Sequence, residues 1–236
     1  MGTKWLLREP SDEAPSRLLC FPYSGCGASM FRQWPERLGR MEVLPLQLPW
    51  RENRMRDPHY GTYEQLATDA VEEIGRYLDR PYAVFGHCGG ALPAFETVLR
   101  IGERGLRPPE RCFVSSQVAP QDGPYGRFLG LDSGGLRGEL LGLLSALGSD
   151  NPSPELVDLF LEVLEADLEA NRRYRKEAAG RVPCPVTAIG WSDDTEVPYG
   201  FMGGWSAWGE TDFPVLKGTH YTFLEAPREL QELLAA

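Results

Sequence analysis

The chain has 236 residues, of which 42% are hydrophobic, and a formal net charge of −10. This length and composition suffice for one sizeable core, so a single domain over residues 1–236 is expected, and the acidic balance argues against a general nucleic-acid role. No apolar run reaches the length of a membrane span, and the five cysteines have neither the spacing of a disulfide framework nor that of a structural zinc site.

The N-terminal residues and the cysteines together indicate a cellular compartment. Residues 1–5 lack the apolar segment of a secretory signal. An odd number of cysteines at irregular spacings is typical of a chain whose thiols stay reduced. We therefore expect a cytoplasmic protein.

Apolar runs alternate with amphipathic segments through the first half of the chain, which indicates a mostly parallel sheet flanked by helices. The elements expected there are, in chain order, a strand at 17–22, a glycine-rich loop at 23–29, a helix at 30–38, a strand at 41–48, a helix at 63–78, a strand at 82–87, a helix at 91–104 and a strand at 111–118. Cys112, in the last of these strands, is expected to be a core thiol.

A polar loop at 49–56 contains three basic residues, Arg51, Arg54 and Arg56. Clusters of this kind are usually solvated surface, and that is the interpretation we favour. The alternative is that the three side chains meet an acidic partner or a phosphate.

The pattern changes between residues 121 and 180, where two amphipathic helices are expected at 136–147 and 153–175. Ser153 and Pro154 are a good N-cap and first-turn pair for the second helix. The length of this insertion favours a lid over ordinary crossover helices. Beyond it we expect strands at 185–190 and 213–216 and a closing helix at 226–234.

A short apolar run at 82–87 ends in Gly-x-Cys-x-Gly and passes directly into a helical pattern. This arrangement is the nucleophile elbow of an α/β-hydrolase with cysteine in place of the usual serine. Gly86 and Gly90 would let strand and helix approach closely, and Cys88 would occupy the apex in a strained backbone conformation. The competing interpretation is a glycine-rich turn that contains a cysteine by chance.

A cysteine nucleophile needs a base, and the base needs an acid that orients it. Of the three histidines, His87 should point away from the nucleophile and His59 lies in an early polar loop, whereas His220 follows a strand near the C-terminus. The acid should come just after residue 190, where Asp194 is the first choice and Asp193 the second. The order of nucleophile, acid and base is then that of an α/β-hydrolase.

The glycine-rich loop at 23–29 should lie beside the elbow and complete an oxyanion hole. Its donors would be the backbone N–H of Gly89 and that of Tyr23 or Ser24. The competing interpretation is a plain strand-to-helix loop. Cys26 lies in the same loop, so whether it can pair with Cys88 stays open.

Together these motifs resemble the stand-alone type II thioesterases of polyketide and nonribosomal peptide synthesis, from residue 18 to residue 234. Residues 21–29 are similar to the family's Phe-Pro-x-Ala-Gly-Gly oxyanion loop, 48–51 to its Tyr-Pro-Gly-Arg segment and 86–91 to its Gly-His-Ser-Met-Gly-Ala elbow. The Asp194 loop and residues 218–220 are similar to its Gly-x-x-Asp-Pro and Gly-Gly-His motifs.

The resemblance implies an α/β-hydrolase fold with a helical lid insertion at about 121–180 that shapes an acyl pocket. It implies no cofactor or metal, and an acyl thioester presented on the phosphopantetheine arm of an acyl or peptidyl carrier protein. Neither nucleic acid nor membrane is an expected partner. Carrier proteins are usually acidic, as this chain is, so docking would need a local basic patch. The candidates are Arg51, Arg54 and Arg56, or else Arg172, Arg173 and Arg175.

The chain also departs from the family pattern, with cysteine for the nucleophilic serine, Cys26 and Trp50 for glycines, and Thr195 for proline. An acyl group on cysteine is itself a thioester, which suits onward transfer. A Cys-dependent acyltransferase or cyclase is therefore the alternative to hydrolysis, and a catalytically inactive carrier-binding module is a third. The related Dieckmann cyclases place their acid after an earlier strand, where this chain has no carboxylate at 115–117.

Overall fold

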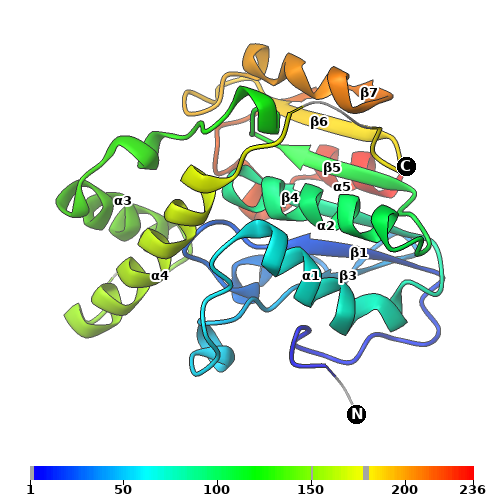
Figure 1. The fold of residues 1–236 in the computed structure, drawn as a ribbon. Coiled ribbons are helices and arrows are strands. Elements are labelled where there is room, and N and C mark those ends of the chain that lie inside the picture. The colour runs from blue at the N-terminus through cyan, green and yellow to red at the C-terminus, as the bar shows by residue number, and fades with distance from the viewer. Residues whose placement is uncertain (1–2, 150, 178–180) are drawn as a thin grey trace.

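The computed structural model describes residues 3–149, 151–177 and 181–236, and within these ranges eight strands form one central sheet in the order β2-β3-β1-β4-β5-β6-β7, with β8 paired to β6 (Figure 1). All pairs are parallel except β2 with β3. The predicted α/β fold with a mostly parallel sheet is thus confirmed. The strands are β1 Ser16–Phe21, β2 Arg37–Leu38, β3 Met41–Pro45, β4 Tyr82–His87, β5 Arg111–Ser115, β6 Val186–Trp191, β7 Thr211–Asp212 and β8 Val215–Leu216.

Helices surround this sheet. Figure 1 shows α1 and α2 together on one face, with α5 on the opposite face. The α-helices are α1 Tyr63–Ile74, α2 Ala91–Glu103, α3 Ser133–Ala146, α4 Pro154–Arg173 and α5 Arg228–Ala235. The short 3₁₀ helices are η1 Ala28–Phe31, η2 Glu52–Arg54, η3 Gly75–Tyr77, η4 Cys88–Gly90, η5 Pro120–Asp122, η6 Arg127–Gly130, η7 Tyr199–Trp208 and η8 Thr222–Glu225.

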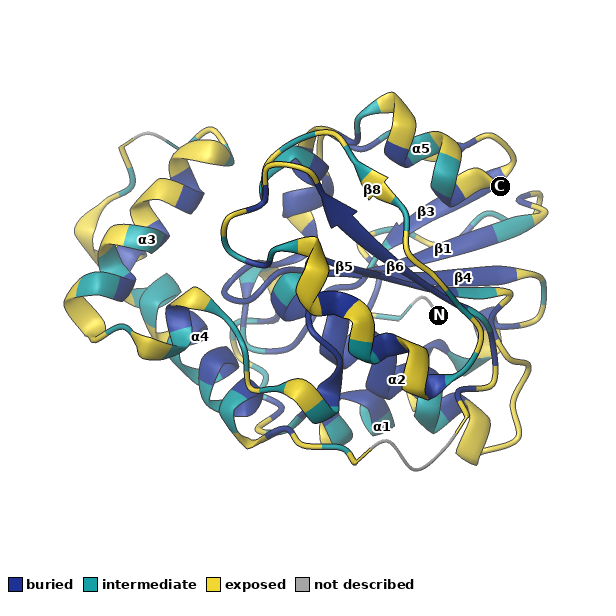
Figure 2. Cartoon of the chain, turned by 90° about the horizontal axis from the view of Figure 1, so that it is seen from above, coloured by how far each residue is buried: buried dark blue, intermediate teal, exposed yellow. Residues whose placement is uncertain are grey.

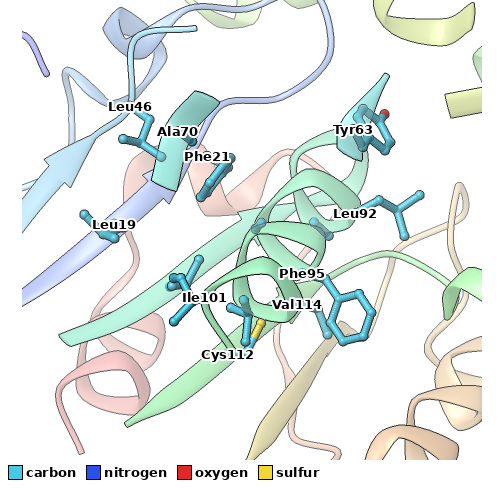
Figure 3. Close-up of a cluster of buried hydrophobic side chains, with 14 of the residues drawn as sticks. Leu19, Phe21, Leu46, Tyr63, Ala70, Leu92, Phe95, Ile101, Cys112 and Val114 are labelled. Atoms are coloured by element: carbon cyan, nitrogen blue, oxygen red, sulfur yellow. The ribbon is translucent and has the colours of Figure 1, made fainter. Parts of the chain in front are cut away.

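Side chains alternate between the two faces of each central strand, as the pleat requires. In β1, Leu19 and Phe21 face the core beneath α1 and α2, whereas Leu18 and Cys20 face the core on the other side. Figure 2 shows the central strands buried on both faces, and Figure 3 shows Phe95 and Cys112 in the first of these cores. Cys112 is therefore a buried core thiol, as expected.

The prediction of a helix at 30–38 is wrong, since the structure has only η1 and the short strand β2 there. Pro35 cannot donate the backbone hydrogen bond that a continuing helix needs. Trp34 is instead anchored across the fold, because its indole Nε1 donates to the carbonyl of Phe223 at 2.9 Å. Leu38 then pairs with Met41 in an antiparallel turn.

The two helices predicted between residues 121 and 180 are present as α3 and α4, and both lie outside the sheet at one end of the molecule in Figures 1 and 2. The Ser153 hydroxyl accepts the backbone N–H of Leu156 at 3.3 Å, so the predicted N-cap is formed. Residues 150 and 178–180 of the predicted insertion lie outside the described residues. Whether the insertion acts as a lid stays a prediction.

Candidate active site

Cys88 lies at the sharp turn between β4 and α2, in the left-handed backbone conformation with φ 47°. A Cβ atom on Gly86 would lie 2.2 Å from the carbonyl oxygen of Gly90, and one on Gly90 would lie 2.6 Å from that of Pro22. Both glycines are therefore required for the close approach, as predicted. The turn leaves Cys88 partly exposed and facing a cavity.

His87 turns away from this cavity, as expected. Its Nδ1 lies 2.9 Å from the Ser115 hydroxyl, and its ring stacks on Phe223 with centroids 3.8 Å apart. Burial and the neighbouring His220 lower the pKa of His87 well below its ordinary value. A neutral, enclosed imidazole of this kind supports the β4 terminus rather than the chemistry.

His220 and Asp194 meet beside the elbow. The imidazole Nδ1 of His220 lies 2.9 Å from Asp194 Oδ2. The same oxygen accepts the Ser116 hydroxyl at 2.7 Å, while Oδ1 accepts the backbone N–H groups of Glu196 and Val197 at 2.8 and 2.9 Å. Burial raises the pKa of Asp194, but these donors outweigh it and lower the pKa below the ordinary value. The carboxylate is thus fixed in place and ionised.

The electrostatics of His220 connect it to the elbow cysteine. Burial alone would lower the pKa of His220, but the adjacent Cys88 sulfur and the Asp194 carboxylate raise it to about 10. Its Nε2 has no hydrogen-bond partner among the described residues. The nearest carboxylate oxygen to that nitrogen is Oε2 of Glu196, at 3.6 Å. The free nitrogen is therefore available to exchange a proton with the neighbouring Cys88 sulfur.

Asp193, the second choice for the acid, makes a different contact. It is exposed, and its carboxylate accepts the hydroxyl of Ser192 at 2.8 Å. The geometry therefore pairs Asp194, and not Asp193, with His220.

The predicted oxyanion donors also lie at the elbow. A Cβ on Gly89 would lie 3.1 Å from the backbone nitrogen of Ser24 and 2.0 Å from its Oγ, so the two residues are in direct contact. The backbone N–H of Tyr23 already donates to Met30 Sδ at 3.0 Å. Ser24 is therefore better placed than Tyr23 to provide the second N–H. The Tyr23 ring instead packs edge-on against His220, with centroids 6.0 Å apart.

The cavity next to Cys88 is small. Its volume is about 20 Å³, enough for roughly one water molecule. Its walls are the elbow, the oxyanion loop, the chain around η6, the C-terminal part of α4 and the loop after β6. An acyl chain therefore needs these walls to separate, and α4 and η6 belong to the predicted lid.

A buried ion pair ties α4 to the loops around the site. The Asp167 carboxylate on α4 accepts one hydrogen bond from each terminal nitrogen of Arg51, both at 2.8 Å. Both side chains are almost fully buried. Its carboxylate also lies within hydrogen-bonding distance of the Gly25 N–H, His59 Nε2 and the Tyr60 hydroxyl. The pair therefore holds α4 against the oxyanion loop.

This arrangement corrects the prediction of a solvated or docking arginine cluster at 49–56. Arg51 and Arg54 are buried, and only Arg56 is exposed. Arg54 donates to the carbonyl of Gln47 at 2.7 Å and pairs with Asp57. Of the two proposed docking patches, this one is not available to a partner.

Sequence reasoning missed three contributors to the site. Ser116 lies where β5 ends, with φ 47°, and no sequence signal marked its hydroxyl as a donor to Asp194. Glu196 is two residues beyond the acid and likewise had no signal. Asp167 did have one, because it is a carboxylate flanked by Leu164 and Leu168 of the predicted apolar helix face.

The structure was also searched for features of other protein classes. Within residues 3–149, 151–177 and 181–236, no group of histidine, cysteine, aspartate and glutamate side chains is arranged to hold a metal ion. None of the helices in those ranges has the length and apolar character needed to cross a membrane.

Known proteins resemble the chain over nearly its full length. The sequence profile of the thioesterase domain family matches residues 16–236. The gramicidin S biosynthesis protein GrsT of Aneurinibacillus migulanus is 31% identical, over 98% of this chain and 92% of its own. RedJ, a thioesterase from the prodiginine pathway in Streptomyces coelicolor, is 35% identical with a TM-score of 0.76, and the match covers 97% of this chain and 88% of RedJ. BorB, a type II thioesterase from the borrelidin biosynthetic cluster, is 26% identical with a TM-score of 0.84, and the match covers 100% of this chain and 98% of BorB.

Proposed function

Because the chain belongs to the thioesterase domain family, and is thus an enzyme that acts on thioesters, we propose that it cleaves them through an acyl intermediate on Cys88. His220 and Asp194 are the base and the orienting acid. The observation that carries this proposal is the Asp194–His220 hydrogen bond of 2.9 Å, with Nε2 of His220 left free beside the elbow cysteine.

The proposed reaction begins with a thiolate at Cys88 and a proton on His220. The sulfur attacks the acyl carbonyl, and the oxyanion that forms accepts hydrogen bonds from the backbone N–H groups of Gly89 and Ser24. Loss of one such donor typically costs about 2.7–4 kcal/mol of barrier. The bond from the acyl carbon to the leaving sulfur then breaks, and His220 gives its proton to that sulfur. Asp194 holds the imidazole in the tautomer this transfer needs.

Release of the acyl group completes the proposed cycle. The neutral His220 takes a proton from water, the resulting hydroxide attacks the acyl carbon, and the Cys88 sulfur leaves as the free acid forms. The substrate is proposed to be an acyl or peptidyl thioester on the phosphopantetheine arm of a carrier protein. The relatives support this, since RedJ and BorB are thioesterases of natural-product pathways.

The cysteine nucleophile supports a second candidate, transfer of the acyl group to another thiol, an amine or an internal nucleophile. The acyl group stays activated as a thioester on Cys88. Incubation with an acyl-carrier thioester, followed by mass spectrometry of the products, separates the two. Free acid supports hydrolysis, whereas an acyl group on a second carrier or in a ring supports transfer. An intact thioester would support the inactive carrier-binding alternative.

A further inference from the structure

The proposed reaction gives no role to Gln117, although this residue lies where the sheet meets the elbow. It comes two positions after the end of β5, is 1% exposed and lines the cavity that Cys88 faces. Glutamine is seldom buried so completely, and a buried amide needs hydrogen-bond partners. The partners of Gln117 therefore show what its side chain holds in place.

Those partners fix the direction of the Gln117 amide. Its Oε1 accepts the backbone N–H of Val118 at 2.9 Å, and its Nε2 donates to the carbonyl oxygen of Cys88 at 3.2 Å. A backbone N–H can donate only to the amide oxygen, so the amide nitrogen is the atom that faces the elbow. The backbone of Gln117 is held as well, because its carbonyl accepts the indole N–H of Trp205 at 2.7 Å. The side chain is therefore a bridge from the end of β5 to the elbow, fixed at both ends.

The hydrogen bond to Cys88 also acts on the first of the proposed oxyanion donors. The carbonyl of Cys88 and the N–H of Gly89 belong to one planar trans peptide unit, in which the two groups point in opposite directions. Whatever fixes the direction of this carbonyl therefore fixes the direction of the N–H. That N–H lies in the first turn of the helical segment that begins with η4, where the helix itself provides no acceptor for it. It can thus donate to an oxyanion in the cavity, which Gly89 lines.

The local backbone does little to restrain this peptide unit. The unit turns about ψ of Cys88 and φ of Gly89, and glycine accepts a wide range of φ. Cys88 is itself strained, with φ 47°, and such residues keep their conformation only where the surrounding structure holds them. The Ala91 N–H also donates to the Cys88 carbonyl, but Ala91 belongs to the same helical segment. Gln117 instead holds the carbonyl from a separate element of the fold.

Resting on the function proposed above, we propose that Gln117 is a positioning residue that orients the Gly89 N–H toward the oxyanion. It acts through the peptide unit between Cys88 and Gly89 and takes no part in proton transfer. Its loss should therefore slow the steps in which an oxyanion forms. Attack of the Cys88 thiolate on a saturated carbon forms no oxyanion, so that reaction should not depend on Gln117.

The test compares two reactions of the same sulfur in wild type and in Gln117→Met, which keeps the length of the side chain and removes the donor. Acylation by acetyl-N-acetylcysteamine passes through an oxyanion, whereas alkylation by iodoacetamide displaces iodide from a saturated carbon. The measured quantity is the ratio of the two rate constants, each obtained from the mass of the peptide that contains Cys88 after an acid quench. This ratio cancels any change in the amount or accessibility of the thiolate.

Two further variants complete the test. Gln117→Glu removes the donor but keeps an acceptor for the Val118 N–H, so it replaces Gln117→Met if that protein does not fold. Gln121→Met is the matched control. The Gln121 amide also joins two partners, the Gly204 carbonyl at 2.8 Å and the Trp208 indole at 2.7 Å, but it does not line the cavity.

We expect the ratio of acylation to alkylation to fall about ten- to a hundredfold in both Gln117 variants, and to stay within about twofold in Gln121→Met. Equal losses in the two reactions would overturn the inference, because Gln117 would then only support the shape of the elbow. An unchanged rate of both reactions would also overturn it. If iodoacetamide modifies Cys88 in the wild type but the thioester never acylates it, the proposed function itself fails, and wild-type protein alone reveals that result.

Discussion

Replacement of Arg51 by methionine tests the buried ion pair that holds α4 to the oxyanion loop. Arg51 is 1% exposed and Asp167 is 2% exposed. The guanidinium donates twice to Asp167 and once each to the carbonyls of Cys26 and Pro49. Methionine keeps much of the volume and leaves the Asp167 charge buried without its main partner.

The expected loss is about 3–5 kcal/mol in the free energy of unfolding, the usual cost of removing one member of a buried pair. The assay is equilibrium denaturation in urea. Arg56→Met is the matched control, since Arg56 is an exposed arginine of the same loop and its loss should cost no more than about 0.5 kcal/mol. Removing both charges, in Arg51→Met with Asp167→Leu, should recover part of the loss.

The pH dependence gives an independent check. Burial raises the pKa of Asp167, but Arg51 and His59 outweigh it and lower the pKa below the ordinary value. The contribution of the pair is therefore complete above a pH of about 4 and is lost as pH falls further. The difference in the free energy of unfolding between wild type and Arg51→Met should therefore become smaller in acid. If Arg51→Met costs no more than Arg56→Met at neutral pH, the reasoning is refuted.

Three further predictions concern the proposed catalytic groups and the elbow. Asp194→Asn should lower kcat/KM for an acyl thioester by about a hundredfold or more, whereas Asp193→Asn should stay within about twofold; similar losses in both would contradict the assignment of the acid. The single-turnover rate of Cys88 acylation should decline as pH rises through about 10, where His220 loses its proton, and a flat profile there would contradict the proposed proton donor. Gly89→Ala should destabilise the fold by about 1–3 kcal/mol, because its Cβ would lie 2.0 Å from Ser24 Oγ. Adding Ser24→Ala should restore only part of this loss in urea denaturation, because the Cβ of residue 24 would still lie 2.9 Å from the new methyl group. A double variant no more stable than Gly89→Ala would contradict that explanation.

The elbow and its partners could be predicted because their signals are local. Gly86, Cys88 and Gly90 lie within one pentapeptide, and each glycine answers a steric demand of that turn. His220 and Asp194 followed from chain order alone, since the chain has few histidines and a short acidic loop after β6. The choice between Asp193 and Asp194 needed coordinates, because adjacent residues of a turn point in different directions.

The Arg51–Asp167 pair could not be predicted, because its members are 116 positions apart and a polar loop gives no sign that its arginine is buried. At 30–38 the sequence did contain a local sign, because Pro35 interrupts a helix, but the hydrogen bond from Trp34 to the distant Phe223 could not be predicted. Trp50 illustrates a third case. It occupies the left-handed region with φ 61°, which explains why the family motif has glycine at this position.

The most direct test of the account is the chemical state of Cys88 during the first turnover. Protein mixed with an acyl-carrier thioester is quenched in acid within that turnover, digested and analysed by mass spectrometry. We predict that the peptide containing Cys88 gains the mass of the acyl group, and that Cys88→Ala protein gains none. Product released while Cys88 stays unmodified at every time point would contradict the covalent mechanism.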